Sequence, residues 1–237
     1  MKTLNKINTQ YKSELFNLDK ISSNWKGFST FALWLCDYIS PKVVVDLGVG
    51  EGYSTSCFAT SQNTDRVYGI DNFEGDSLSG FFTRDESYEK VSQTLQRLEL
   101  HNAMILRGDF KKVYKRFNES IDILHIDGVH LYKDVKNDYK LWVNKLREGG
   151  VVLLHGIHSY PYDVGRFFDE ITLPKLYLKD IHLRGFCNVK DVDESIKDSA
   201  YFLTGLGVVS KNIEVLSDIK EVFNKFLIKE KVNEKKD

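Results

Sequence analysis

The sequence alternates short apolar runs with stretches of helical periodicity, and this alternation restricts the fold more than any other feature. The apolar runs have strand length and each ends in or beside Asp, Gly or His: KVVVDLG, RVYGIDN, AMILRGD, DILHIDG and GGVVLLH. Helical stretches separate them, notably 28–39, 85–100 and 131–146. Strands that alternate with helices imply right-handed crossovers. We therefore predict an α/β fold with a doubly wound, mostly parallel sheet.

The alternation breaks down after residue 160. YLKDIHLRGF and AYFLTGLGVVS are extended in character with no long helix between them, and we expect them to add an antiparallel edge to the sheet. A chain of 237 residues with 42% hydrophobic residues supports one core rather than two. We predict a single domain over residues 1–228, in which 1–40 form a helical cap, followed by a charged tail over 229–237.

Charge and cysteine usage limit the partners of the protein. Lysine and arginine total 33 against 34 acidic residues, so the net charge of −1 provides no field for nucleic acid. No run approaches the roughly 18 apolar residues that span a bilayer, and no signal-peptide core is visible. The cysteines, at 36, 57 and 187, are odd in number and far apart. We expect a cytoplasmic protein with small-molecule partners and no membrane insertion.

A glycine-rich turn follows the first predicted strand. Gly48, Gly50 and Gly52 are spaced GxGxG where the next helix begins, so backbone can approach a ligand and the helix amino terminus can face an anionic group. Asp71 ends the next strand about 20 residues later, where an acid can accept hydrogen bonds from ribose hydroxyls. The turn and the acid together indicate an adenosine-containing ligand, although a simple tight turn and a helix-capping aspartate remain alternatives.

The glycine spacing separates two candidate cofactors. The dinucleotide fingerprint reads GxGxxG, whereas here GxGxG follows Asp46 directly in VDLGVGEG, which resembles the first motif of class I methyltransferases. Further blocks occur in the order seen in methyltransferase family 24, which is common among bacterial surface-polysaccharide and natural-product genes. The resemblance covers residues 25–171 and 201–210 and is carried by IDNFEGDSLSGFF, MILRGDF, DILHIDGVHLYKDVKNDYKLWVNKLREGGVVLLHGI, VGRFFDEI and TGLGVVS.

The resemblance implies S-adenosylmethionine as cofactor and S-adenosylhomocysteine as product. It also implies that Asp109 and Phe110 border the adenine and that Asp127 faces the transferred methyl group. We expect the cofactor-binding residues to be Asp46, Gly48, Gly50, Tyr53, Ser54, Asp71, Asn72, Asp109, Phe110 and Asp127.

The methyl acceptor should bind at the carboxyl ends of the fourth and fifth strands. Asp127 ends the fourth strand, His130 follows it, and His158 follows the fifth strand in LLHGIHSY. A hydroxyl acceptor needs a base, and carboxylates and imidazoles supply one. We predict Asp127, His130 and His158 as catalytic residues, with His155 less favoured and His125 packed inside. Each histidine also has a structural reading as a hydrogen-bonded group.

Two positions depart from the family pattern. Family members have an acid after the fifth-strand histidine, where this chain has Gly156, and a histidine where it has Leu78. In related oxygen methyltransferases the strand-four and strand-five acids bind a divalent cation, so the loss of one acid disfavours a metal. We assign no metal ligands and favour a metal-free general base.

The sequence favours O-methylation of a sugar or nucleotide-linked sugar hydroxyl in surface-polysaccharide biosynthesis. N- or phospho-group methylation, which needs no strong base, is one alternative. A catalytically inactive cofactor-binding partner is another, and a nicotinamide-dependent oxidoreductase is disfavoured by the glycine spacing. A homodimer stays open, as does the role of the insertion at 177–199 in acceptor recognition or subunit contact.

Overall fold

The computed structural model describes residues 10–76, 80–81, 83–157, 163–178 and 205–227. The helices and strands of this part run in the order α2 (Lys12–Leu18), η1 (Lys26–Phe28), α3 (Ser29–Ile39), β1 (Val43–Leu47), α4 (Tyr53–Thr60), β2 (Arg66–Asp71), β3 (Gly75–Asp76), β4 (Gly80–Phe81), α5 (Arg84–Arg97), β5 (Ala103–Arg107), α6 (Phe110–Tyr114), β6 (Ile121–Ile126), α7 (Tyr132–Trp142), η2 (Val143–Lys145), β7 (Leu146–His155), α8 (Val164–Glu170), β8 (Lys175–Leu178), β9 (Leu206–Ser210), α10 (Ile213–Phe223) and η6 (Asn224–Phe226).

The main sheet has seven strands in the order β5-β2-β1-β6-β7-β9-β8. The pairs β5–β2, β2–β1, β1–β6 and β6–β7 are parallel, whereas β9 pairs antiparallel with both β7 and β8. The predicted doubly wound sheet with an antiparallel edge is therefore confirmed. Of the extended segment that we predicted over 177–186, the first two residues belong to β8 and the others lie outside the described residues.

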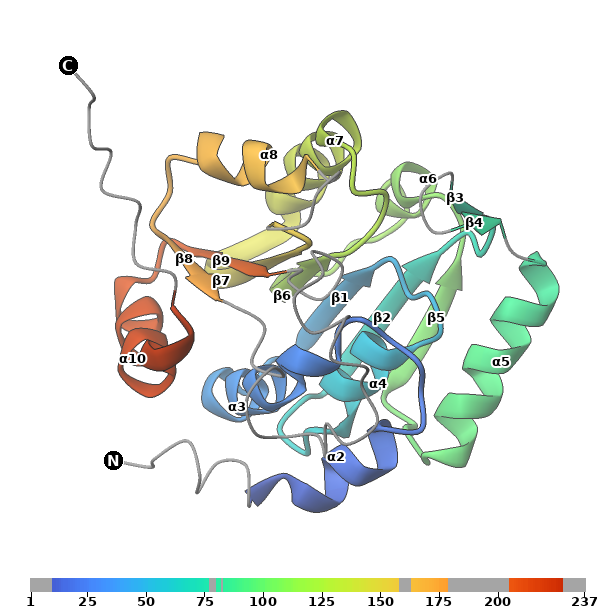
Figure 1. Ribbon diagram of the computed structural model, residues 1–237. Helices are drawn as coiled ribbons and strands as arrows, with labels where there is room; N and C mark the ends of the chain where they lie inside the picture. The colour runs from blue at the N-terminus through green and yellow to red at the C-terminus, as the bar shows by residue number, and fades with distance from the viewer. Residues whose placement is uncertain (1–9, 77–79, 82, 158–162, 179–204, 228–237) are drawn as a thin grey trace, which may run out of the picture.

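Helices cover both faces of this sheet (Figure 1). Adjacent residues of the central strands point to opposite faces, so each face carries apolar side chains that the helices bury. Val44 of β1 and Ile123 of β6 pack in one core, beneath α2, α3, α4 and α10. Val45 and Leu124 pack in the other core, beneath α7 and α8. The central strands are buried on both faces, which explains why their sequences read as continuous apolar runs.

The described part of the predicted N-terminal cap, residues 10–40, is helical and belongs to the first core. Asp37 on α3 accepts hydrogen bonds from Tyr11 (2.6 Å) and Ser61 (2.9 Å), which fasten α2 and the end of α4 to α3. Burial and the neighbouring Asp37 carboxylate raise the pKa of Tyr11 above its ordinary range. The predicted tail, residues 229–237, lies outside the described residues.

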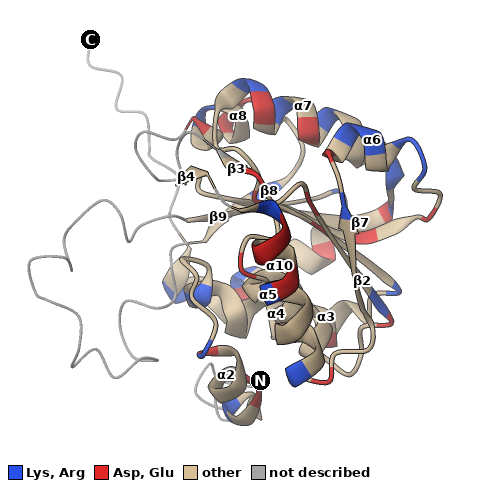
Figure 2. Cartoon of the chain, turned by 90° about the vertical axis from the view of Figure 1, so that its right-hand side faces the viewer, with Lys and Arg blue, Asp and Glu red and all other residues tan. Residues whose placement is uncertain are grey.

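Two features of the described residues bear on the expectation that the protein binds no nucleic acid and does not insert into a membrane. Figure 2 shows acidic and basic residues interspersed along α7 and α8. No helix within the described ranges is long and apolar enough to cross a membrane.

The five parallel strands end at one edge of the sheet, and the strand order reverses between β1 and β6. Ligands of open α/β sheets bind in the crevice at such a switch point, outside the carboxyl ends of the strands. The loops after β1 and β6 begin with Gly48 and Asp127. The fold therefore brings the glycine turn beside the predicted catalytic loop.

Candidate active site

The glycine turn after β1 depends on backbone conformations that favour glycine. Gly48, Gly50 and Gly52 have φ values of +95°, +52° and +88°. A Cβ on Gly48 would lie 2.1 Å from the backbone oxygen of Asp127, so this glycine lets the two loops meet. In the part of the chain that the structure describes, no atom would lie within 4 Å of a Cβ on Gly50, which leaves space where a ligand can approach the backbone.

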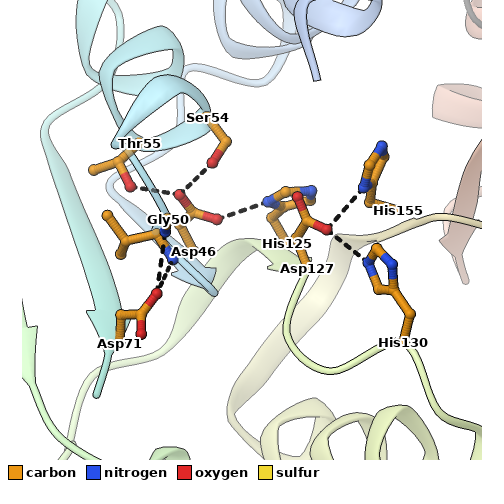
Figure 3. Close-up of polar contacts among 10 residues, drawn as sticks. Asp46, Gly50, Ser54, Thr55, Asp71, His125, Asp127, His130 and His155 are labelled. Atoms are coloured by element: carbon orange, nitrogen blue, oxygen red, sulfur yellow. Dashed lines mark hydrogen bonds and ion pairs between the residues drawn. The ribbon is translucent and has the colours of Figure 1, made fainter. Parts of the chain in front are cut away.

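Asp71 holds this turn in shape. Its Oδ2 accepts hydrogen bonds from the backbone N–H groups of Val49 (2.8 Å) and Gly50 (3.1 Å), and its Oδ1 accepts one from Phe73 (2.7 Å). Burial raises the pKa of the Asp71 carboxyl, and the three backbone donors only partly offset that effect. A contact between Asp71 and a ribose stays a prediction, while its contacts with the turn are what the structure describes (Figure 3).

Asp46 is turned into the protein beneath the same turn. The residue is 0% exposed, and its carboxylate accepts hydrogen bonds from Ser54 and Thr55 and contacts His125 Nδ1 at 2.7 Å. Asp46 and His125 are cross-strand partners in the β1–β6 register, so their side chains lie on one face (Figure 3). The predicted packing of His125 is confirmed. A cofactor contact by Asp46 stays a prediction.

The other predicted cofactor residues surround the turn in different ways. Tyr53 and Ser54, at the start of α4, are buried, and a cofactor contact by either stays a prediction. Asn72 is partly exposed and its Oδ1 accepts a hydrogen bond from the Glu74 backbone (3.0 Å). Two more residues stand at the start of α6: Asp109 caps the helix by accepting from the Lys112 backbone, and the Phe110 ring packs on Gly128.

The loop after β6 brings two histidines onto one carboxylate oxygen. Asp127 Oδ1 lies 2.8 Å from His130 Nε2 and 2.7 Å from His155 Nδ1 (Figure 3). The side chains of Asp127 and His130 are 18% and 17% exposed, whereas that of His155 is 4% exposed. The predicted neighbourhood of Asp127 and His130 is therefore present. His158, the third predicted catalytic residue, lies outside the described residues.

The electrostatics of this cluster favour an ionised Asp127. Burial alone would raise the pKa of its carboxyl, but the charge of His155 and the hydrogen bonds of both histidines outweigh burial and hold the pKa well below its ordinary value. A carboxylate with a depressed pKa is a weak base but a good partner for an imidazole. His130 is the more exposed imidazole, so it is better placed than His155 to reach a substrate. His155 fixes Asp127 from the buried side.

Comparison with known families identifies this part of the chain. Residues 45–157 match the model of methyltransferase family 24, which describes a methyltransferase domain. Residues 45–157 are a methyltransferase domain. The resemblance found in the sequence is thereby confirmed, and every site residue from Asp46 to His155 lies inside the match.

The chain is also similar to one curated relative and to several solved structures. An uncharacterised protein of Sinorhizobium fredii, y4gI, is 30% identical over 63% of the chain, and the chain spans 17% of that protein's length. The O-methyltransferase TomG of Streptomyces achromogenes, solved in complex with SAM, has a TM-score of 0.57 at 12% identity, covering 82% of this chain and 89% of its own. The O-methyltransferase of Bacillus cereus, solved with SAH, has a TM-score of 0.55 at 15% identity over 80% and 82% of the two chains.

The fold of the methyltransferase domain also occurs in an enzyme of another name. Spermidine synthase of Thermotoga maritima has a TM-score of 0.51 at 16% identity, with coverage of 84% of this chain and 66% of that one. At such identities the likeness shows the fold alone, so the reaction has to be argued from the site residues.

The domain offers one group of side chains that could hold a metal among the described residues. One ligand atom each from Asp127, His130 and His155 lies within 4.8 Å of the others. Two imidazoles and one carboxylate suit zinc or iron, whereas magnesium prefers oxygen ligands. This donor set therefore does not fit the magnesium site of an oxygen methyltransferase.

Asp138 on α7, which was not predicted from the sequence, lies near the loop after β6. A Cβ on Gly128 would lie 3.7 Å from Asp138 Oδ2. Burial, and then the charges of Asp134 and Asp109, raise the pKa of Asp138 from 3.8 to about 7. The helical spacing of Asp134 and Asp138, one turn apart, was the signal that could have pointed to it.

This raised pKa predicts how stability depends on pH. Between about 4 and 7 the folded state binds more protons than the unfolded state at Asp138, so stability should fall as pH rises through that window. Asp138→Asn should therefore raise the free energy of unfolding at pH 8, relative to wild type, by about 1–2 kcal/mol after allowance for partial exposure, and have little effect at pH 4. Urea unfolding at both pH values measures this. Removal of the exposed Glu221 by Glu221→Gln is the charge control, and an equal effect of both variants would contradict the prediction.

Proposed function

We propose that the protein is an S-adenosylmethionine-dependent O-methyltransferase that forms S-adenosylhomocysteine. The observation that carries this proposal is the Asp127–His130 pair beside the glycine turn of a methyltransferase domain. The open space at Gly50, next to the backbone held by Asp71, fits a ligand that lies against backbone. Solved neighbours with this fold carry SAM or SAH, which supports the choice of cofactor.

The site residues suggest how such a transfer would be assisted. When bound, S-adenosylmethionine supplies a sulfonium methyl group that the acceptor oxygen attacks as the carbon–sulfur bond breaks toward sulfur. Asp127 accepts a hydrogen bond from the Nε2–H group of His130. The lone pair of the imidazole that can accept a proton is therefore on Nδ1. His130 then takes the proton of the acceptor hydroxyl, and Asp127 stabilises the resulting imidazolium. No step of this scheme requires a metal ion, and the donor set does not fit magnesium.

For the acceptor we propose a hydroxyl of a sugar or nucleotide-linked sugar in surface-polysaccharide biosynthesis, modified in the cytoplasm. This choice rests on the family resemblance and on the presence of a base, because an amine acceptor would not need one. The acceptor class is thus the part of the proposal that turnover assays must decide.

Cofactor binding is tested by calorimetric titration with S-adenosylmethionine, S-adenosylhomocysteine and NADH. We expect micromolar binding of both sulfur nucleosides and none of NADH. Asp71→Ala should weaken that binding about 100-fold, because it removes the acceptor of two N–H bonds in the turn. Asp65→Ala, an exposed acid just before β2, is the matched control and should bind like wild type. Binding of NADH alone, or of none of the three, would overturn the proposal.

Turnover is tested by following S-adenosylhomocysteine release with sugar, nucleotide-sugar, amine and phosphate acceptors. Release with a hydroxyl acceptor that survives EDTA supports a metal-free O-methyltransferase. Release with amine acceptors alone would replace it by N-methylation. Cofactor binding without turnover on any acceptor would favour an inactive binding partner instead.

A further inference from the structure

Gly156, the residue that follows β7, lies directly against the imidazole of His130. A Cβ added to Gly156 would be 3.0 Å from His130 Cε1, 3.1 Å from Nδ1 and 3.3 Å from Nε2. These separations are shorter than ordinary van der Waals contact, and the φ of +78° at Gly156 also disfavours any side chain. The ring of His130 thus occupies the space that a side chain at position 156 would need.

His130 is held in this place from several sides. Its Nε2 bonds Asp127 Oδ1 at 2.8 Å, and its backbone oxygen accepts a hydrogen bond from the Asp163 N–H at 3.1 Å. The His155 ring lies beside it, with ring centroids 5.5 Å apart. Gly156 is itself fixed, because its N–H donates to the Gly205 oxygen at 3.0 Å. Because both backbones are held, a side chain at 156 would push the ring away from Asp127.

We propose that Gly156 is a positioning residue, and that its lack of a side chain is what allows His130 to bond Asp127. The catalytic consequence rests on the proposed function, in which His130 is the base. Gly156 is also the position that departs from the acid expected after the fifth strand. We interpret the loss of the acid at position 156 as a replacement: the His130 imidazole, from the loop after β6, fills the space that a side chain after β7 would occupy. It is not a loss of function.

The test compares Gly156→Ala with a matched glycine on the same strand. Gly149 has a φ of +77°, but a Cβ there would meet nothing closer than Asn212 atoms at 3.9 Å. Gly149→Ala therefore reproduces the backbone strain without touching the site. The imidazole resonances of His130 are read by NMR on histidine-labelled protein and assigned with His130→Ala. We expect them to shift in Gly156→Ala and not in Gly149→Ala. Unshifted resonances in Gly156→Ala would overturn the proposal.

Kinetics and stability are then measured in a double-mutant cycle with His130→Ala. Gly156→Ala alone should lower kcat about 10- to 100-fold, with little change in cofactor affinity. In the His130→Ala background it should cause no further loss of kcat, and its effect on Tm should shrink to that of Gly149→Ala. Independent, additive effects in the cycle would overturn the coupling.

The two proposals fail separately. The NMR comparison and the Tm cycle need no methyl transfer, so they decide the role of Gly156 even if the protein proves to have another activity. If Gly156→Ala does not fold while the double variant does, the steric conflict with His130 is demonstrated directly.

Discussion

Replacement of Asp127 by asparagine is expected to lower kcat by about 100- to 10,000-fold while cofactor binding falls far less. Asparagine keeps the size of the side chain but not its charge, and Asp127 Oδ1 is the atom that both His130 and His155 approach. A neutral amide can present its NH₂ group to a histidine and favour the wrong tautomer. It also cannot stabilise the imidazolium that forms when the acceptor loses its proton.

The measurement is steady-state release of S-adenosylhomocysteine together with calorimetric cofactor titration. Asp122→Asn is the control, because Asp122 is a buried acid at the start of β6, the strand that leads to Asp127, and accepts hydrogen bonds from the Lys42 and Val43 backbones. It should reduce stability yet retain kcat. If the two variants lost activity equally, the loss would reflect damage to the strand rather than to the catalytic pair.

Gly48→Ala is expected to destabilise the protein by about 3–5 kcal/mol and to abolish cofactor binding. The new Cβ would lie 2.1 Å from the Asp127 oxygen and 2.9 Å from the Gly128 nitrogen, both of them backbone atoms. Neither loop can yield easily, since the Gly48 N–H donates to Ile70 and the Asp127 N–H donates to Leu47. The substitution therefore forces apart the two loops that form the crevice.

Gly80→Ala separates this clash from backbone strain. Gly80 has a φ of +94°, almost the +95° of Gly48, but among the described residues no atom would lie within 4 Å of a Cβ there. Urea unfolding of both variants should show a loss of about 1 kcal/mol for Gly80→Ala, from strain alone, and the larger loss for Gly48→Ala. Equal losses would mean that the contact between the loops after β1 and β6 is not close in solution.

Much of the fold could be predicted because its signals are local. Each parallel strand is a short apolar run in the sequence. Helices α3 and α5 begin within one residue of their predicted starts. The antiparallel edge was predicted from two extended segments after residue 160 that had no long helical pattern between them. The candidate site followed from the fold, since residues at the carboxyl ends of parallel strands must share one edge.

What the sequence could not supply were the partners of each polar side chain. It ranked His155 below His130 and gave no sign that both would meet one oxygen of Asp127. It also gave no sign that strand register would pair the Asp46 carboxylate with His125 in the interior.

By itself, then, the sequence determined the order of the parallel strands, the class of the domain and the set of chemical groups at the edge of the sheet. These depend on hydrophobic periodicity and on residues close together along the chain. Only the tertiary structure decided which carboxylate meets which imidazole, and that Gly156 lies against the His130 ring. Those contacts join loops that are distant in sequence, and they are fixed by register and close packing, which no local pattern encodes.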